Sequence, residues 1–143
     1  MNIRPLQTPD LPAYHLLRIA LWPDSAGDFE REVSEILNTD HLASFVAEQD
    51  GVLVGFAEVS LRAYAEGCES SPVGYLEGWY VAPTHRNTGV GRRLVEAAED
   101  WARAKGCSEM ASDTELHNTQ SQQAHARLDY QEVERMVCFR KTL

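Results

Sequence analysis

Cysteine is scarce in this sequence and never occurs in a paired motif. The three cysteines are Cys68, Cys107 and Cys138, and no Cys-x-x-Cys spacing joins any two of them. An odd number of widely separated cysteines is typical of reduced thiols, not of a secreted disulfide framework. We therefore expect a cytoplasmic protein whose fold needs no disulfide bond.

Long apolar runs are also absent. Residues 1–10 contain Arg4, Asp10 and two prolines, which excludes a signal peptide over this segment. Further along the chain, charged residues interrupt every apolar stretch within a few positions, so no membrane-spanning helix is expected.

Positive charge is in short supply. The 13 Lys and Arg residues face 22 Asp and Glu residues, and the formal net charge is −9. This balance disfavours nucleic acid and anionic membranes as partners but suits a cationic partner. The five histidines have no metal-ligand spacing, so no metal site is expected.

What the sequence does contain is ordinary for a globular protein. It has 143 residues, of which 43% are hydrophobic and 24% are charged. No repeat or flexible linker divides the chain, so we expect residues 1–143 to form a single domain.

The pattern of apolar residues predicts alternating strands and helices. A capping Thr8 followed by Pro9 marks the first helix, and Asp50-Gly51 marks a hairpin turn. The predicted strands are 2–5, 43–48, 52–62, 73–81, 109–112 and 133–141, and the predicted helices are 8–21, 28–37, 91–105 and 118–128. A strand meander followed by a βαβ unit favours a mixed sheet over a doubly wound one.

The most informative segment is Arg-Asn-Thr-Gly-Val-Gly at residues 86–91, between a predicted strand and a predicted helix. Its glycines allow backbone N–H groups to converge on an anion at the start of the helix. Arg86, Arg92 and Arg93 add positive charge, so a pyrophosphate fits the segment. Glycine at such a turn also has a simpler interpretation as turn chemistry. Neither a Walker loop nor a GxGxxG motif with an acidic ribose binder is present.

Arg-x-x-Gly-x-Gly after a strand that ends Trp-Tyr-Val-Ala-Pro resembles the acetyl-CoA-binding motif of the GNAT superfamily of N-acetyltransferases. Segments 21–23, 40–45, 70–73, 76–78 and 110–113 are further similar to the chromosomal-type aminoglycoside 6'-N-acetyltransferases. The resemblance implies an α/β (α+β) fold, with a mixed, mostly antiparallel sheet that splays between its two middle strands and is flanked by about four helices. It also implies direct transfer of acetyl from acetyl-CoA to the 6'-amine of an aminoglycoside in a ternary complex, which confers antibiotic resistance.

The same resemblance implies which residues contact acetyl-CoA. They are Tyr80, Val81, Arg86, Thr88, Gly89, Val90, Gly91, Arg92 and Asn118. The backbone N–H of Val81 is expected to donate to the thioester oxygen as that oxygen gains negative charge.

Two carboxylates are candidates for amine chemistry. Glu77 interrupts an apolar strand, and burying it without a partner would be costly. It either faces solvent, accepts local hydrogen bonds, or lies at the cleft, where it would bind the substrate ammonium and accept its proton. Asp113 either caps the turn that follows it or, as the resemblance implies, contacts the aminoglycoside. Trp22 and Tyr64 are candidates to flank the sugar rings, although Trp22 also fits a core position.

His125 is the candidate acid. Many GNAT enzymes have a tyrosine at the matching position that protonates the departing CoA thiolate, and histidine can donate a proton near neutral pH. A lone helical histidine also suits a surface or packing role. No cysteine stands out as an acyl-accepting nucleophile, because packing accounts for Cys107 and Cys138 and no cation lies near Cys68.

Acidic residues gather in 24–35 and recur at Glu66, Glu69, Glu77 and Asp113, segments that the resemblance places around the acceptor cleft. Alternative functions remain open: acetylation of a polyamine or a protein amine, or a module that binds acetyl-CoA without turnover. A homodimer is expected from the resemblance.

Overall fold

The computed structural model describes residues 1–24 and 27–143. The strands are β1 (Asn2–Pro5), β2 (Leu42–Gln49), β3 (Val52–Arg62), β4 (Val73–Val81) and β5 (Met110–Ser112). The helices are α1 (Leu11–Leu21), α2 (Phe29–Asn38), α3 (Val90–Ala104) and α4 (Thr119–Arg127), with short 3-10 turns at Thr8–Asp10 and Pro83–His85. Each predicted element except the last strand is therefore present, with bounds that agree within a few residues.

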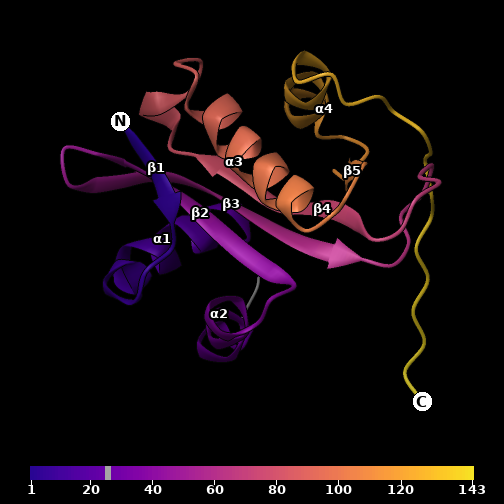
Figure 1. Ribbon diagram of the computed structural model, residues 1–143, viewed down its shortest axis with the longest axis horizontal. Coiled ribbons are helices and arrows are strands. Elements are labelled where there is room, and N and C mark those ends of the chain that lie inside the picture. The colour runs from indigo at the N-terminus through magenta and orange to yellow at the C-terminus, as the bar shows by residue number, and fades with distance from the viewer. Residues whose placement is uncertain (25–26) are drawn as a thin grey trace.

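The five strands form one mixed sheet in the order β1-β2-β3-β4-β5 (Figure 1). All neighbouring pairs are antiparallel except β4 and β5, which run parallel. The β2–β3 hairpin turns at Asp50 and Gly51, whose φ angles are +52° and +79°. Two successive residues with positive φ suit a hairpin turn that follows the twist of the strands, and the predicted turn is confirmed.

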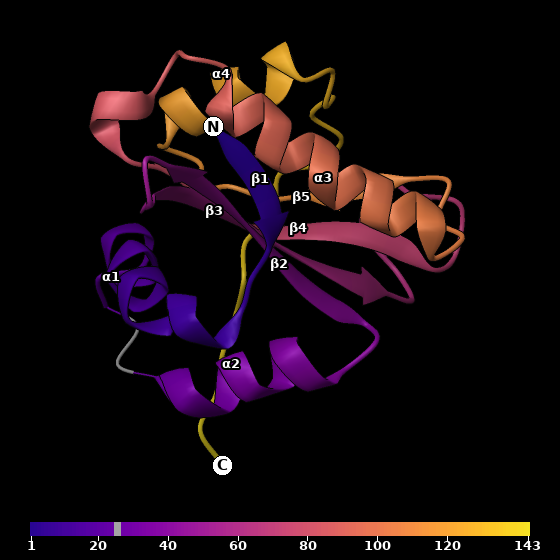
Figure 2. The same cartoon turned by 60° about the vertical axis from the view of Figure 1, so that its left-hand side comes forward.

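Helices cover both faces of the sheet (Figure 2). On one face, Leu94 and Ala98 of α3 are fully buried against a cluster that includes Leu76 of β4. On the other face, Tyr14 of α1 packs against Phe56 of β3, together with residues of α2. The apolar positions that recur along each helix thus face the sheet, as helical periodicity requires.

β4 and β5 separate along their length. β5 pairs only with Gly74, Tyr75 and Leu76 at the start of β4. The rest of β4, through Val81, continues to pair with β3 but has no β5 residue beside it. The predicted splay of the sheet is confirmed, and one edge of β4 is left open.

The predicted strand at 133–141 is wrong for this structure. Residues 130–143 have no secondary structure, and those from 131 onward are exposed. A strand exists only through hydrogen bonds to a neighbouring strand, and this segment has no strand beside it. Cys138 consequently lies exposed and not in the core, whereas Cys107 is buried as expected.

The start of the first helical segment also differs from the prediction. Gln7, not Thr8, precedes the first turn, and its backbone N–H donates to Asp10 Oδ2 at 2.9 Å. Arg4 binds the same carboxylate at 2.6 Å, so Asp10 joins β1 to the helix start. Within the described ranges, no helix has the length and apolar character needed to cross a membrane.

Candidate functional site

The open edge of β4 presents backbone groups of Val81. The N–H of Ala82 donates to Val54 O of β3 at 2.8 Å. Alternate residues of a strand direct their N–H and C=O groups to opposite sides, so those of Val81 point away from β3, toward the open edge. The Val81 carbonyl accepts from Arg86 Nε at 2.8 Å. Its N–H is therefore placed to bind a group lying along the open edge.

The segment after β4 leads directly into α3. Asn87 and Gly89 both have positive φ, +60° and +88°, and Gly89 is the residue before the first helical position. The first backbone bond of the helix runs from Arg93 N to Gly89 O at 3.2 Å. The N–H groups of Val90, Gly91 and Arg92 consequently lack an acceptor inside α3 and point outward from its positive end. Such an arrangement binds phosphate.

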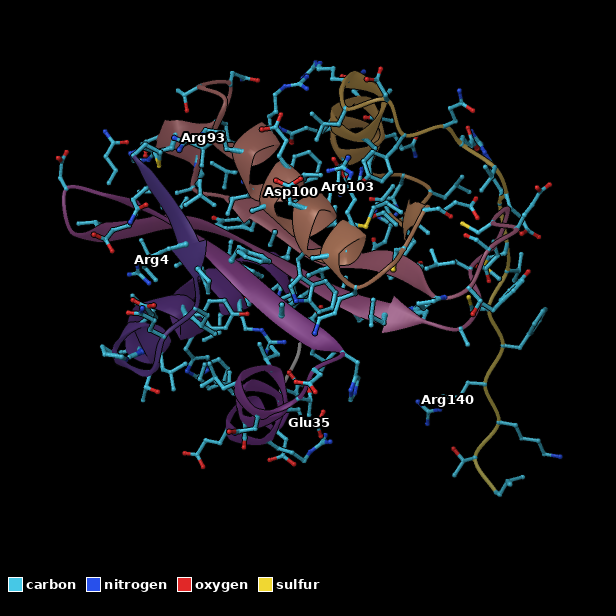
Figure 3. The ribbon with its side chains drawn as sticks, in the orientation of Figure 1. Arg4, Glu35, Arg93, Asp100, Arg103 and Arg140 are labelled. Carbon is cyan, nitrogen blue, oxygen red and sulfur yellow. The ribbon has the colours of Figure 1, made fainter. Side chains whose placement is uncertain are left out.

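Arginines surround the start of α3. Arg86 lies over the ring of Tyr80, with 5.6 Å from its Cζ to the ring centroid. Arg92 Nη2 donates to Arg127 O at the end of α4 at 3.0 Å. Arg93 lies beside the N-terminus in Figure 3, where its Nη1 donates to Met1 O at 3.3 Å. Positive charge is therefore concentrated here in a chain that is acidic overall.

Gly91 is constrained by its neighbour. A Cβ built on this residue would approach the indole of Trp79 to within 3.0 Å. The indole nitrogen of Trp79 is a buried donor without a hydrogen-bond acceptor among residues 1–24 and 27–143. A side chain at position 91 would therefore crowd the indole of Trp79 where the helix start meets the open half of β4.

Glu77 occupies a β-bulge in β4. Leu76 pairs with Val59 and Gly78 pairs with Glu58, so Glu77 has no partner in the β3 register. A bulge redirects a side chain out of the regular alternation. The Glu77 side chain is 31% exposed, which makes it accessible to a ligand above the sheet.

The Glu77 carboxylate is held by two side chains of β3. Ser60 Oγ donates to Glu77 Oε1 at 2.6 Å, and Arg62 donates from Nε at 2.9 Å and from Nη2 at 2.8 Å. The Glu77 carboxylate is the main cause of a raised pKa for Arg62. Glu77 is therefore a partly exposed carboxylate held by two side chains of β3.

Asp113 belongs to the same side-chain network. The Arg62 guanidinium stacks on the ring of Tyr75 at 3.5 Å, and the Tyr75 hydroxyl donates to Asp113 Oδ2 at 2.5 Å. Burial, aided by Asp113, raises the pKa of Tyr75, so the phenol keeps the proton that it donates. The structure thus brings Glu77 and Asp113 into one network through Arg62 and Tyr75.

Trp22 and Tyr64 have different surroundings. Trp22 ends α1 and packs near Phe56, with 6.0 Å between ring centroids, and it also covers Gly78, where a Cβ would come within 2.4 Å of the indole. Trp22 therefore packs beside the bulge and is partly exposed. Tyr64 is 68% exposed, just beyond the end of β3.

His125 lies across the splay, with both ring nitrogens engaged. Nδ1 is 2.7 Å from Ser121 O, and Nε2 is 2.8 Å from the hydroxyl of Ser112, the last residue of β5. A carbonyl can only accept, so Nδ1 carries a proton, and the neutral ring accepts from Ser112 at Nε2. Ser112 Oγ is also 3.2 Å from Leu76 O, which gives its proton a second acceptor when the histidine is charged. Trp79 and Tyr130 pack edge-on against the ring.

Asn118 opens α4 as expected, since its side chain accepts from Ser121 N at 3.1 Å. Two acidic residues of α2 are engaged elsewhere: Glu32 pairs with Arg18, and Glu35 with Arg31. Because α2 packs mainly against β2, these carboxylates do not join the Glu77 network.

Neither Cys68 nor Cys107 is activated as a nucleophile by a lowered pKa. Burial raises the pKa of Cys107, and burial together with nearby Glu109 raises that of Cys68. In the two described ranges, no group of three or more His, Cys, Asp or Glu side chains could hold a metal ion.

Sequence reasoning missed Arg62, Tyr75 and Ser112. Arg62 and Tyr75 stand in strands where cationic and aromatic residues are unremarkable, and Ser112 is a small residue at a strand end. Arg62 lies on one strand of an antiparallel pair, and Tyr75 and Glu77 lie on the other. This spacing could have identified Arg62 and Tyr75 from the sequence. For Ser112 the chain offered none.

The family model for "Acetyltransferase (GNAT) family" matches residues 6–130. A Serratia marcescens protein called aminoglycoside N(6')-acetyltransferase type 1 is 49% identical over 137 residues, 94% of each chain. A Salmonella typhimurium protein of the same name is 46% identical over 143 residues, 99% of each chain. The solved structure of AAC(6')-Iy with the bisubstrate analog CoA-S-monomethyl-acetylneamine has a TM-score of 0.95 and 45% identity, and covers 99% of this chain and 98% of its own.

Proposed function

The chain belongs to the GNAT acetyltransferase family, and from that premise we propose that it transfers the acetyl group of acetyl-CoA to the 6'-amino group of aminoglycosides. The observation that carries this function is the placement of two carboxylates, Glu77 and Asp113, in one network beside the separation of β4 and β5. The start of α3, which suits an anion, follows the C-terminal end of β4 at Val81. A cationic acceptor and an anionic donor therefore have separate places to bind.

The donor side fits acetyl-CoA. The unpaired N–H groups of Val90, Gly91 and Arg92 suit its pyrophosphate, supported by Arg86, Thr88 and Gly89 in the same turn. The Val81 N–H faces the open edge, where an extended pantetheine can lie, and Tyr80 orients Arg86 through its ring. A contact from Asn118 remains a prediction, since its carbonyl oxygen is used to cap α4.

The acceptor side of the site fits an aminoglycoside, a sugar that carries several amino groups. An aminoglycoside carries several ammonium groups, each of which favours a carboxylate acceptor. Glu77 and Asp113 supply two such acceptors, with Trp22 beside the bulge and exposed Tyr64 beyond β3 available to flank the rings. A bound ammonium competes with Arg62 for Glu77, so substrate binding replaces one ion pair with another.

Acetyl-CoA supplies the activated acetyl group. Glu77 accepts the proton that the substrate ammonium loses, directly or through one water, because only the neutral amine can attack. Attack of the neutral amine on the thioester carbon gives a tetrahedral adduct whose oxyanion is stabilised by the Val81 N–H. The adduct loses its second nitrogen proton to water and collapses to the amide as the C–S bond breaks. The raised thiol pKa values of Cys68 and Cys107 favour direct transfer in a ternary complex over an acyl-enzyme.

The departing thiolate takes a proton from His125 by way of Ser112. Both ring nitrogens of His125 are engaged, and Ser112 stands where β4 and β5 begin to separate. A charged His125 donates to Ser112 Oγ, which passes its own proton on toward the open edge. His125 in this assignment acts through Ser112.

Further elements complete this proposal. Residues 1–143 act as one acetyltransferase domain in the cytoplasm, where acetyl-CoA and reduced thiols coexist, and the enzyme confers aminoglycoside resistance. The enzyme works as a homodimer and needs neither nucleic acid, a membrane nor a metal.

The test follows thiol release from acetyl-CoA by the purified full chain. A matched pair of neomycin-class aminoglycosides, one with a 6'-amine and one with a 6'-hydroxyl, serves as acceptor. We expect turnover with the 6'-amine and background release with the 6'-hydroxyl. Faster turnover of a polyamine or a peptide amine would show that this amine, and not an aminoglycoside, is the acceptor. CoA binding by calorimetry, with no release for any amine, would identify a non-catalytic module.

A further inference from the structure

Arg62 places a cation of the protein itself on the acceptor side of the candidate site. Its Nε donates to Glu77 Oε1 at 2.9 Å and its Nη2 donates to Glu77 Oε2 at 2.8 Å, so the guanidinium binds both oxygens of the carboxylate. The guanidinium also stacks on the ring of Tyr75, with 3.5 Å from Cζ to the ring centroid. Glu77, and to a lesser extent Asp113, raises the pKa of Arg62. Arg62 therefore holds the position that a substrate ammonium would take on Glu77.

A neutral hydroxyl donor holds each of the two carboxylates independently of Arg62. Ser60 Oγ donates to Glu77 Oε1 at 2.6 Å, and the Tyr75 hydroxyl donates to Asp113 Oδ2 at 2.5 Å. Burial raises the pKa of Tyr75, so this donor stays protonated. Without the guanidinium, each carboxylate would keep one donor and its negative charge. Arg62 is therefore the member of the network that a ligand can displace while the carboxylates stay in place.

The guanidinium has room to leave Glu77. Arg62 is the last residue of β3, its side chain is 42% exposed, and that of Glu77 is 31% exposed. The Arg62 side chain can therefore turn into solvent without unpacking the core. Exposed ion pairs and cation–π contacts are individually weak, but a two-pronged ion pair stacked on an aromatic ring is stronger than a single contact. Displacement of Arg62 thus has a moderate cost, which every ammonium that binds Glu77 has to meet.

We propose that Arg62 is an internal competitor of the substrate, which weakens the binding of every amine at Glu77, so that only acceptors with more than one ammonium group bind well. A first ammonium replaces the guanidinium on Glu77, and one ion pair is exchanged for another. A second ammonium on Asp113 adds an ion pair without breaking one. Polycations therefore bind with a surplus that monoamines lack.

This inference rests on the proposed function, because it takes an amine as the ligand of Glu77, and it identifies a residue that sets which amines are bound. A competitor has a distinctive signature. Its removal strengthens the binding of all competing ligands by the same factor, since each ligand no longer has to displace it. Removal of a residue that contacts the substrate, or that only holds Glu77 in place, would instead weaken binding. The direction of the change in affinity therefore distinguishes these roles for Arg62.

The first experiment measures amine binding by calorimetry to the full chain saturated with CoA. Neamine, which carries several ammonium groups, is compared with methyl 6-amino-6-deoxyglucoside, which carries one. Arg62→Met removes the charge but keeps an apolar side chain that can lie over Tyr75. We expect both amines to bind this variant about five- to tenfold more tightly than the parent. Weaker or unchanged binding of either amine, or a gain for neamine alone, overturns the proposal.

Arg31→Met is the matched control. Arg31 is a 63% exposed arginine of α2 that pairs with Asp28 and Glu35, so its loss changes the net charge by the same amount outside the Glu77 network. Both affinities should stay within about twofold of the parent, because exposed charges are screened over such a separation. Arg62→Lys keeps the charge but not the two-pronged contact, and its affinities should lie between those of the parent and Arg62→Met. An equal gain in Arg31→Met would attribute the effect to net charge and overturn the competition.

The second experiment observes the guanidinium itself by nitrogen-15 NMR. The Nε–H resonance of Arg62 is assigned by its absence in Arg62→Lys, and neamine is then added to the CoA complex. We expect this N–H to exchange faster with water once the guanidinium has left Glu77. An unchanged resonance at saturating neamine overturns the displacement.

Neither measurement requires turnover, so thiol release on the same samples separates this inference from the proposed function. Tighter amine binding by Arg62→Met in a chain that releases no thiol refutes only the reaction. Turnover of the 6'-amine together with an unchanged or weaker affinity in Arg62→Met refutes only the competition.

Discussion

The two halves of the candidate site are built from different parts of the chain. The donor half is a continuous segment, 81–92, and acts chiefly through backbone N–H groups and the start of α3. The acceptor half is made of side chains from β3, β4 and the end of β5, joined by ion pairs and hydrogen bonds. Backbone groups tolerate side-chain change but not a change in conformation. A side-chain network tolerates small changes in backbone conformation but loses contacts when one of its side chains is substituted.

The largest effect is expected on the acceptor half, from Glu77→Gln. The amide cannot accept the ammonium proton, and it leaves Arg62 without its anion, so kcat should fall by roughly 100- to 10,000-fold. Steady-state thiol release measures this loss. Glu115→Gln, on a carboxylate that is 77% exposed, is the control. Equal losses of kcat in the two variants would show that Glu77 does not take part in the proton transfer.

Asp113→Asn should affect binding more than turnover. Loss of a charged hydrogen-bond acceptor costs about 1.5–3 kcal/mol, which corresponds to roughly a ten- to hundredfold rise in the KM of the aminoglycoside. The KM of acetyl-CoA should stay nearly constant. A rise in the donor KM instead would show that the two halves of the site are not separate.

Ser112→Ala tests whether His125 acts through the Ser112 hydroxyl. If His125 acts through this hydroxyl, kcat should fall by about a hundredfold, the lower end of what a positioned proton donor contributes. Ser112→Thr keeps a hydroxyl and should recover most of the rate. Alanine and threonine variants with the same kcat would show that Ser112 only packs against His125.

Gly89→Ala tests the backbone basis of the donor half. Both Gly89 and Gly106 have positive φ and open space where a Cβ would lie, but they flank opposite ends of α3. Alanine at either position should lower the free energy of unfolding by about 1–2 kcal/mol. Only Gly89→Ala should weaken acetyl-CoA binding, by about fivefold, as measured by calorimetry. Equal acetyl-CoA affinities for the Gly89→Ala and Gly106→Ala variants would contradict a backbone anion site.

Salt is expected to have the smallest effect. The Debye length falls from about 10 Å at 0.1 M to about 3 Å at 1 M ionic strength, which screens exposed charges such as Glu77. The KM of the aminoglycoside should rise a few-fold over this range. A KM that does not change with salt would indicate recognition by neutral contacts with the sugar rings.

The donor half could be predicted from sequence because its residues are neighbours in the chain. The strand 73–81, the glycine turn and the helix that follows it are all encoded locally, and their predicted bounds agree with the structure within one residue. Glu77 could also be singled out, since a carboxylate in an apolar strand is unusual. Its position in a β-bulge could not, because a bulge depends on how two strands align.

The amino-acid sequence thus specifies the helices, the strands, the anion-binding turn and the candidate acids, since propensity, apolar periodicity and turn chemistry act over a few residues. Folding adds what depends on distant segments. It joins Glu77 and Asp113 through Arg62 and Tyr75, and it engages His125 with Ser112. It also leaves 133–141 without a partner strand, although this segment has the pattern of a strand, because hydrogen bonding between strands requires a neighbour that the chain's own sheet does not bring to it.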